Sequence, residues 1–363
     1  MRAAVMRAVG ESLSIEDIEH SKPGPFEVVV RVAAAGLCHS DVRFMEGSYQ
    51  VALPAVLGHE SAGVVEEVGD AVTHVVPGDH VITFLSVFCG SCSYCFSGRA
   101  NLCSNREATQ RQVGESPRLS SAGEALHQFL NLASFAERML VHENAVVKVT
   151  TEIPLDRAAL LGCGVATGLG AVFNTAAVGP GETVAVIGCG GVGLSAVQGA
   201  RIAGAGRIIA IDRIAEKLQL AAQMGATHVV DSSREDAVAT VKELTDGLGV
   251  EKSFEAIGAK TTAEMAFAML RPGGTATVIG LIPIGQTVEI PGVELLDEKR
   301  IQGSNMGSNR FRIDVPRYVE MYLDGRLNLD DMVTDRIALE EINEGFARMR
   351  TGRTARIVVD FEQ

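Results

Sequence analysis

Residues 183–193 read TVAVIGCGGVG, a short apolar run that leads into a glycine-rich turn. The β-branched residues from Thr183 to Ile187 predict a buried parallel strand, and the residues after the turn predict a helix. Glycines at this spacing allow a tight strand-to-helix turn and a close backbone approach to a pyrophosphate, whose charge the helix N-terminus attracts. The turn residues that we expect to contact a dinucleotide are Gly188, Gly190, Gly191, Val192 and Gly193.

A second strand, residues 207–211, ends at Asp212, nineteen residues after Gly193. A carboxylate at this place accepts hydrogen bonds from the adenosine ribose and repels a 2′-phosphate. Strand, turn, helix, second strand and acid therefore predict a site for NAD rather than NADP.

The pattern of alternating strands and helices continues after Asp212. Helices are predicted at 214–224, 235–246 and 261–270, and further strands at 227–231, 250–258, 275–281 and 300–304. Six β elements with right-handed crossovers predict an α/β fold with a doubly wound, six-stranded parallel sheet of the Rossmann type.

The rest of the chain predicts a second domain. Residues 1–35 alternate apolar and polar in short runs, which is typical of antiparallel β structure. Residues 105–131 are polar with little periodicity and predict a surface loop, and the tail predicts two helices and a strand that return to this domain. We expect a mainly antiparallel β catalytic domain at 1–165 with a cysteine loop at 89–103, the dinucleotide-binding domain at 166–304, and the return segment at 305–363.

Composition limits the classes of protein that the chain can belong to. A formal charge of −13 and the lack of a Lys/Arg run argue against a nucleic-acid partner. No apolar run approaches the length of a membrane-spanning helix, and the N-terminal stretch carries an arginine within its apolar residues, so we expect neither an anchor nor a signal peptide. The expected partner is a small molecule, and the expected location is the cytoplasm.

Four of the seven cysteines lie in one short loop, at Cys89, Cys92, Cys95 and Cys103. Four thiolates can close a tetrahedron around Zn²⁺ with no open position, which predicts a structural zinc. The opening CxxCxxC also occurs in ferredoxins, where the fourth cysteine comes sooner and is followed by proline. Here Cys103 comes after seven intervening residues and is followed by Ser104, which favours zinc.

Three further metal-ligand residues, Cys38, His59 and Cys163, lie far apart in the sequence. Two thiolates and an imidazole with a free fourth position suit a catalytic zinc. Spacing alone cannot bring them together. Cys163 in an Ala/Gly-rich helix is equally consistent with a small buried hydrophobic residue, and His59 with a hydrogen-bonded core histidine.

The motifs GLCHSD, GHE, CxxCxxCx7C, LLGCGVATG, VIGCGGVG and GRTARIVV occur in this order along the chain. The whole sequence resembles the zinc-dependent medium-chain alcohol dehydrogenases of the long, class III-like type, whose catalytic domain is GroES-like. The resemblance implies one catalytic zinc on Cys38, His59 and Cys163, one structural zinc on the four-cysteine loop, and NAD as cofactor.

The resemblance also implies roles for residues around the catalytic zinc. Glu60 corresponds to an acid behind the metal, Asp41 to the carboxylate that orients His59, and Ser40 to the hydroxyl beside the substrate oxygen. The residues expected to contact NAD, besides the glycine turn and Asp212, are His39, Thr167, Lys217, Ile279, Leu281 and Arg356.

The implied reaction is the reversible NAD-linked oxidation of a primary alcohol, aromatic or of medium chain length, to its aldehyde by hydride transfer. A homodimer formed through the edge of the nucleotide-binding sheet is expected, with a tetramer as the alternative. Two other functions stay open: oxidation of an S-(hydroxymethyl) adduct of a thiol with formaldehyde, and a catalytically retired NAD-binding protein.

Two features depart from the family pattern. Arg43 stands where many members have the histidine that ends the proton relay, and because arginine stays protonated we expect the proton to leave through water. Glu107 falls where the glutathione-adduct enzymes carry an arginine, which disfavours a glutathione adduct. The candidates for the substrate pocket are mostly apolar: Tyr49, Leu85, Phe129, Leu130, Leu281, Asn305 and Met306.

Overall fold

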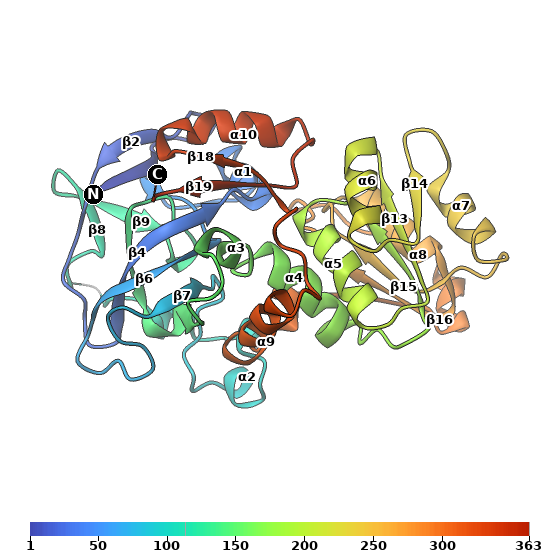
Figure 1. Cartoon of the computed structure of the whole chain (residues 1–363), viewed down its shortest axis with the longest axis horizontal. Coiled ribbons are helices and arrows are strands. Elements are labelled where there is room, and N and C mark those ends of the chain that lie inside the picture. The colour runs from blue at the N-terminus through green and yellow to red at the C-terminus, as the bar shows by residue number, and fades with distance from the viewer. Residues whose placement is uncertain (113, 363) are drawn as a thin grey trace. The chain divides into compact units, whose positions relative to one another are not determined.

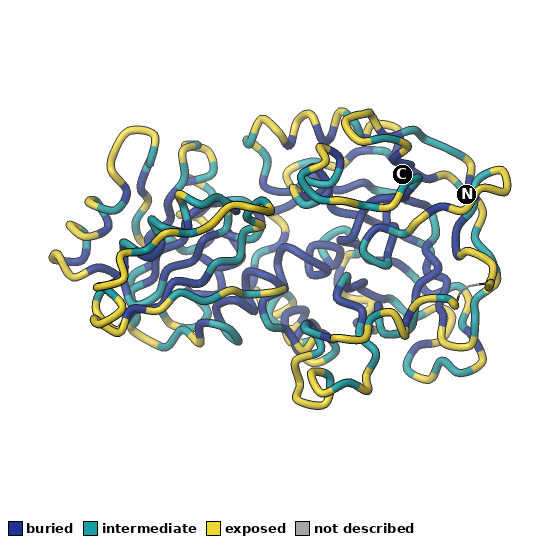
Figure 2. Tube along the Cα trace, turned by 180° about the vertical axis from the view of Figure 1, so that it is seen from behind, coloured by how far each residue is buried: buried dark blue, intermediate teal, exposed yellow. Residues whose placement is uncertain are grey.

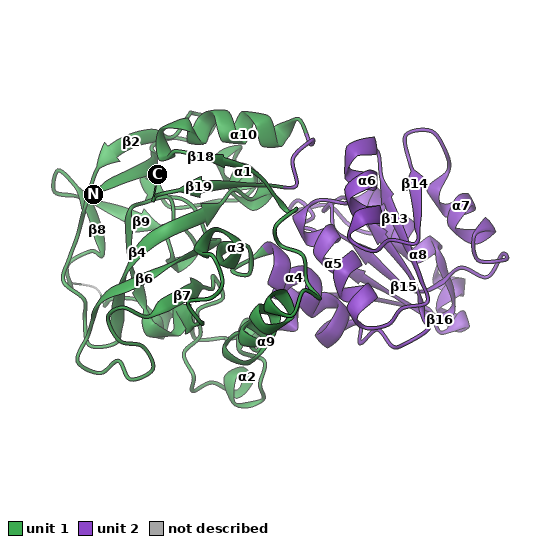
Figure 3. Ribbon diagram, in the orientation of Figure 1, with its two compact units in different colours: residues 1–163, 310–351, 356–363 green, residues 164–309, 352–355 purple. Residues whose placement is uncertain are grey.

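A computed structural model describes residues 1–112 and 114–362 and divides the chain into two compact units (Figure 3). The first unit holds residues 1–163, 310–351 and 356–363, and the second holds residues 164–309 and 352–355. Figure 1 labels the elements of each unit.

The second unit is built on a parallel sheet whose strand order is β14-β13-β12-β15-β16-β17 over the described residues. Strands 3-2-1-4-5-6 in chain order define the doubly wound Rossmann fold, so the predicted fold class is confirmed. The strands are β12 (Thr183–Ile187), β13 (Arg207–Asp212), β14 (His228–Asp231), β15 (Val250–Glu255), β16 (Leu270–Val278) and β17 (Arg300–Gly303).

Helices connect these strands because each must cross over to reach a parallel neighbour. The apolar central strand β12 is buried from Val184 to Ile187, as a strand covered on both faces requires. The helical elements of this unit are α4 (Gly164–Gly170), the π-helix η5 (Ala171–Thr175), α5 (Gly191–Ile202), α6 (Ala215–Gln223), α7 (Ala237–Glu243), α8 (Lys260–Ala268), η6 (Gly292–Asp297) and η7 (Met306–Ser308).

The first unit contains two β-sheets over the described residues. The larger follows the order β11-β7-β6-β4-β19-β18, with β10 also paired to β4, and its centre is the buried strand β4 (Glu27–Gly36). Figure 2 shows the interior strands of both units as buried. The other strands of this sheet are β6 (Ser61–Val68), β7 (His80–Thr83), β10 (Arg138–His142), β11 (Val146–Lys148), β18 (Val333–Ile337) and β19 (Arg356–Asp360).

The smaller sheet corrects one expectation. Residues 105–131 were expected to form a surface loop, but they contain a hairpin that joins the sheet β2-β1-β5-β9-β8-β3. Leu119 and Leu126 pair across the hairpin and are both buried, which explains why these strands form within a largely polar stretch of sequence. The strands are β1 (Arg2–Met6), β2 (Ser14–Asp17), β3 (Glu19–His20), β5 (Ala55–Val56), β8 (Leu119–Ser121) and β9 (Glu124–Gln128).

Short helices cap the sheets of the first unit. The C-terminal segment joins this unit through β19, which pairs antiparallel with β4 at the register Val358↔Gly36. The helical elements are α1 (His39–Met45), α2 (Ser93–Phe96), η1 (Ala100–Leu102), η2 (Arg106–Thr109), η3 (Phe129–Asn131), η4 (Glu143–Ala145), α3 (Leu155–Leu160), α9 (Phe311–Leu323), η8 (Leu339–Glu341) and α10 (Ile342–Arg350).

The unit boundaries differ from the expected 165/166 and 304/305. The first falls after Cys163, and residues 305–309 and 352–355 belong to the second unit. Asn309 explains the later boundary, because its side chain donates to the main-chain oxygens of Ala166 and Met306 within the second unit. Among the helices of the described residues, none is both long and apolar enough to cross a membrane.

Candidate metal and cofactor sites

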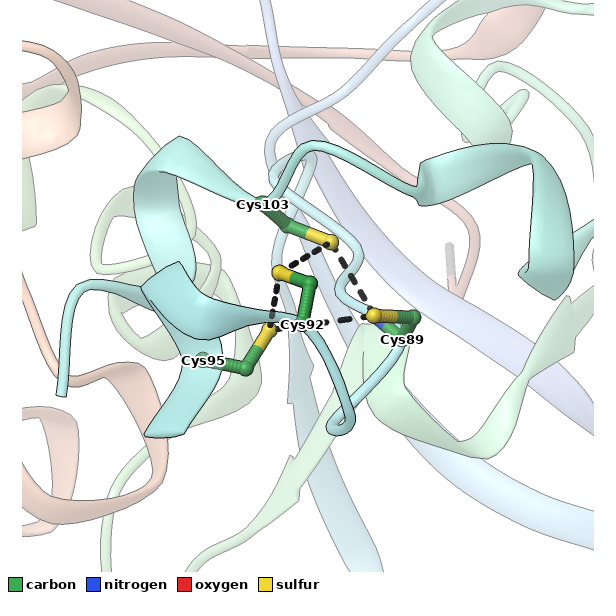
Figure 4. A group of neighbouring side chains, drawn as sticks. All are labelled: Cys89, Cys92, Cys95 and Cys103. Atoms are coloured by element: carbon green, nitrogen blue, oxygen red, sulfur yellow. Dashed lines mark hydrogen bonds between the residues drawn. The ribbon is translucent and has the colours of Figure 1, made fainter. Parts of the chain in front are cut away.

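The loop that contains α2 brings four sulfur atoms together (Figure 4). Their Sγ–Sγ distances are 3.5 Å for Cys92–Cys95, 3.9 Å for Cys92–Cys103 and 4.0 Å for Cys89–Cys95. A tetrahedral zinc with Zn–S bonds of about 2.3 Å has S–S edges of about 3.8 Å, so these thiols fit a closed zinc site.

Main-chain N–H groups in this loop favour the thiolate form that a metal needs. The amides of Cys95 and Ser104 hold the pKa of Cys92 at about 5, and the amide of Ser91 lowers the pKa of Cys89. Burial has the opposite effect on Cys95, and its pKa rises to about 12. A bound cation deprotonates its thiol ligands, including one such as Cys95 whose pKa is raised by burial. A cluster that combines lowered and raised thiol pKa values therefore fits a metal site rather than four independent thiols.

A second cluster lies in the first unit, where Cys38, His59 and Cys163 come together from three separate segments. Their candidate ligand atoms all lie within 4.8 Å of one another, and the three residues are buried. Cys38 precedes α1, His59 lies between β5 and β6, and Cys163 follows α3. Three protein ligands of this type leave one position open on a tetrahedral zinc, as a catalytic site requires.

Asp41 links two of the three ligand segments. Its carboxylate accepts from the main-chain N–H groups of Cys38 (3.2 Å) and Gly58 (3.3 Å), and it lies 3.1 Å from Nδ1 of His59. Burial disfavours the charged imidazole, but Asp41 outweighs it and the pKa of His59 lies well above its ordinary value. Nδ1 is thus engaged by Asp41, which leaves Nε2 as the ring atom available to a metal.

The two thiols of the cluster have pKa values that are shifted in opposite directions. Their mutual hydrogen bond lowers the pKa of Cys38 and raises that of Cys163. Arg356 is buried nearby, with Nε 3.4 Å from Oε1 of the fully buried Glu60. Gly36 makes room for this pair, because a Cβ there would lie 2.4 Å from Oε1 of Glu60. Two thiolates beside an acid need compensating positive charge, which a metal and Arg356 would supply.

Aromatic side chains form one wall beside the ligand cluster. Phe129 packs edge-on against His59 with ring centroids 5.6 Å apart, and Phe44 contacts both Phe129 (4.7 Å) and Tyr49 (5.5 Å). The sequence interpretation included Phe129 and Tyr49 as pocket candidates but missed Phe44. Its place in the GLCHSDVRF motif, one turn after Ser40 on α1, is the signal that could have found it.

The remaining residues expected near the metal differ in exposure. Ser40 is half-buried, with Oγ 3.6 Å from Sγ of Cys38, and Arg43 is also half-buried. His39 is exposed at the start of α1. Leu85 and Leu130 pack against the apolar core of the first unit, and Leu130 has a left-handed backbone (φ 49°).

The glycine turn of the second unit has the geometry that a dinucleotide needs. Gly188 has φ +93°, and a Cβ on Gly193 would lie 1.7 Å from the oxygen of Gly188, so both positions require glycine. A Cβ on Gly190 would meet nothing within 4 Å, so this glycine borders open space at the N-terminus of α5. The N–H groups at the first turn of a helix, here those of Gly191 and Val192 among them, suit a phosphate.

Asp212 lies at the carboxyl end of β13, next to the glycine turn. Its carboxylate accepts from the N–H groups of Cys189 (2.7 Å), Arg213 (2.7 Å) and Ile214 (3.1 Å). These contacts fix the carboxylate before any ligand binds. Lys217 lies near the start of α6, the helix that follows β13, and is half-buried.

Other expected cofactor residues of the second unit lie on two segments. Ile279 follows β16 directly and donates to the main-chain oxygen of Glu255, and Leu281 is 41% exposed two residues later. Thr167 on α4 lies with Oγ1 3.5 Å from Sδ of Met306. Both side chains of this pair are almost fully buried, at 7% and 9% exposure. Asn305 beside them is exposed.

Comparison with known proteins agrees with this geometry. Residues 24–151 match the alcohol dehydrogenase GroES-like domain family, and residues 191–322 match the zinc-binding dehydrogenase family. An NDMA-dependent alcohol dehydrogenase of Amycolatopsis methanolica is 40% identical over 99% of this chain and 98% of its own length. An S-(hydroxymethyl)glutathione dehydrogenase of Synechocystis is also 40% identical, over 99% of both chains.

A solved structure, the benzyl alcohol dehydrogenase of Acinetobacter calcoaceticus, superposes with a TM-score of 0.93 at 34% identity, covering 99% of this chain and 98% of that one. The chain therefore belongs to the zinc-dependent medium-chain alcohol dehydrogenase family. The predicted family and enzyme class are thereby confirmed, and an oxidoreductase replaces the retired NAD-binding protein as the interpretation of this sequence.

Proposed function

We propose that the protein is an NAD-dependent zinc alcohol dehydrogenase that reversibly oxidises uncharged primary alcohols, aromatic alcohols above all, to aldehydes. The observation that carries the proposal is the buried cluster of Cys38, His59 and Cys163, whose histidine is oriented by Asp41. This donor set is typical of a catalytic zinc with an open coordination position.

The ligand residues and the glycine turn would hold the two groups that the reaction needs. When bound, zinc lowers the pKa of a coordinating hydroxyl and NAD accepts the hydride from the alcohol carbon. We assign to the half-buried Ser40 hydroxyl the step of taking the alcohol proton and passing it outward, and water is the next acceptor because Arg43 stays protonated. Asp41 keeps Nδ1 of His59 engaged throughout, so the ring cannot turn away from the metal.

The substrate class follows from the aromatic wall. The rings of Phe129, Phe44 and Tyr49 form a continuous series beside His59. Phe129 is buried behind the half-buried rings of Phe44 and Tyr49, which are the two that an aromatic alcohol would contact. The 34% identical relative named for benzyl alcohol supports this preference.

A second candidate function is oxidation of an S-(hydroxymethyl) thiol adduct. The 40% identical Synechocystis relative supports it. Glu107, exposed on η2, would repel the carboxylates of glutathione, so an adduct of a less acidic thiol is the version that this chain favours.

We also propose a homodimer formed through β17, the edge strand of the parallel sheet. The segment before this strand exposes three large apolar side chains, Ile284 (77%), Val293 (73%) and Leu296 (83%). An edge strand beside exposed apolar residues is stabilised when a second copy pairs with it. Light scattering should give twice the chain mass, and Leu296→Glu should shift the protein toward the monomer. The cysteine clusters, with all seven thiols free, support a reducing, cytoplasmic location.

The test of the function is a panel of assays that follow NADH absorbance. Benzyl alcohol, medium-chain alcohols and secondary alcohols are offered with NAD and then with NADP. Formaldehyde with several thiols completes the panel, and a further arm with NDMA as an added electron acceptor follows the loss of NDMA absorbance, because the acceptor consumes the NADH. Turnover of benzyl alcohol with NAD, abolished by a zinc chelator, supports the main proposal. Turnover of formaldehyde only when a thiol is present supports the second candidate function. The absence of turnover with every substrate contradicts both.

A further inference from the structure

The segment after β17 has an unusual backbone. Met306, Gly307 and Ser308 all have positive φ values of 50°, 66° and 50°. Two of the three carry side chains, for which this conformation is unfavourable. Such a run persists only where the surrounding structure holds it in place.

Asn309 holds the three residues with positive φ in place through hydrogen bonds. Its side chain is 1% exposed, and Nδ2 donates both to the oxygen of Met306 (2.6 Å) and to the oxygen of Ala166 (2.7 Å). Asn174 donates to Oδ1 of Asn309 at 3.3 Å, so both ends of the amide are engaged. One buried side chain thus ties the left-handed turn to helix α4.

The two carbonyl groups bound by Asn309 lie next to Thr167 and Met306, which are expected near the cofactor and the substrate. Ala166 precedes Thr167, and the Thr167 hydroxyl meets the Met306 sulfur at 3.5 Å. Close packing surrounds the tie, since a Cβ on Gly170 would lie 2.4 Å from the oxygen of Gly307 and 2.6 Å from Nδ2 of Asn309. The helix also widens to the π-helix η5 directly after Gly170, as helices often do at functional sites.

We infer that Asn309 is a positioning residue that fixes Thr167 and Met306 relative to each other for the nicotinamide half of the cofactor. The inference rests on the proposed function, because the family resemblance gives Thr167 as an expected contact of NAD and Met306 is a candidate for the substrate pocket. Asn309 itself is buried, with 1% exposure. Its effect passes through the main chain on either side of the pair.

The variant Asn309→Ala removes both donated hydrogen bonds, and Ser253→Ala is the matched control. Ser253 is fully buried in the same unit and its hydroxyl also donates to a helix carbonyl, that of Ala266 at 2.7 Å. We expect Asn309→Ala to lower kcat for benzyl alcohol by about tenfold and to weaken NADH binding, measured by nicotinamide fluorescence, by a similar factor. Ser253→Ala should change neither.

A double-mutant cycle separates positioning from general destabilisation. If Asn309 acts through Met306, then Asn309→Ala in the Met306→Ala background should change kcat by less than about twofold. Hydrogen exchange provides a readout independent of cofactor and turnover, and Asn309→Ala should accelerate exchange in residues 164–170 and 304–309 and leave the other segments unchanged.

Three outcomes would overturn the inference. In the first, Asn309→Ala behaves like Ser253→Ala in kcat and NADH binding. In the second, Asn309→Ala lowers kcat by the same factor in the Met306→Ala background as in wild type. In the third, hydrogen exchange in residues 164–170 and 304–309 stays unchanged. A wild-type protein that neither binds NADH nor oxidises any alcohol would instead contradict the proposed function, while hydrogen exchange would still report whether Asn309 holds the turn.

Discussion

The hairpin β8–β9 is held to the rest of the first unit by a buried carboxylate, which pairs with Arg118 directly before β8, and this contact makes stability depend on pH. Glu27 is buried and accepts from Nε of Arg118 at 2.7 Å, from Nη2 of Arg111 at 2.5 Å and from the N–H of Gly24 at 2.8 Å. Burial alone would raise the pKa of Glu27. The two guanidinium groups and the Gly24 amide outweigh it and hold the pKa at about 2, below the ordinary 4.5.

This shift sets the size of the effect. One pKa unit corresponds to about 1.4 kcal/mol, so Glu27 adds about 3 kcal/mol to the free energy of unfolding at neutral pH. Because the folded-state pKa lies below the unfolded one, the contribution is fully present above the unfolded pKa and is lost as the pH falls toward about 2. Glu27→Gln also leaves Arg118, with 6% of its side chain exposed, without its charge partner. We therefore expect a loss of about 3–5 kcal/mol at pH 7.

Urea unfolding followed by far-UV circular dichroism at pH 7, 5, 4 and 3 measures the effect. Both proteins lose zinc in acid, so this effect cancels when the free energy of unfolding of Glu27→Gln is subtracted from that of wild type. That difference should shrink to about half by pH 3. Glu124→Gln is the control, because Glu124 lies on the same hairpin and pairs with Arg7 while 55% exposed. It should cost at most about 1 kcal/mol. A Glu27→Gln difference that is below 1 kcal/mol, or that does not vary with pH, would refute this reasoning.

Three further predictions concern the proposed active site. Asp41→Asn removes the charge that orients His59 and should weaken zinc at the catalytic site by about 10- to 100-fold, seen by chelator competition, while the four-cysteine site keeps its metal. Asp212→Ser removes the repulsion of a 2′-phosphate and should lower the ratio of kcat/KM with NAD to that with NADP by at least about tenfold, whereas an unchanged ratio would remove Asp212 from cofactor selection. Arg43→His supplies a titratable group and should raise the rate of alcohol oxidation at low pH in a pH–rate profile; no change would argue against proton exit through water in the wild type.

Local patterns explain why much of the fold could be predicted. The strand, glycine turn, helix and terminal Asp212 follow one another within thirty residues, so their spacing along the chain is enough to predict how they are arranged. The four cysteines of the zinc loop are similarly close in the chain. In both cases short-range spacing limits the structures that the residues can form.

Long-range contacts explain what the sequence could not provide. Cys38, His59 and Cys163 meet only because three loops converge, and before the fold was described only the family resemblance joined them. The polar hairpin β8–β9 is held by Glu27, whose partner Arg118 directly precedes β8 and lies 91 residues later in the chain. Strand β18 was missed because its order comes from pairing with β19.

The hydrogen bonds of Asn309 are a further example of contacts that the sequence does not reveal. Its partners Ala166 and Met306 lie 143 and 3 residues away, and nothing in the local sequence marks an asparagine as a donor to two main-chain oxygens. Side-chain-to-backbone contacts of this kind become visible only once the fold is known.

The central claim is that Cys38, His59 and Cys163 hold a catalytic zinc separate from the four-cysteine zinc. The most direct test measures zinc by mass spectrometry and NADH formation with benzyl alcohol in wild type and Cys163→Ser, with Cys189→Ser as a control for the loss of a buried thiol outside both clusters. The account predicts two zinc ions per chain in wild type and Cys189→Ser. It predicts one in Cys163→Ser, with a rate reduced by at least about a hundredfold. Two zinc ions and an undiminished rate in Cys163→Ser would contradict it.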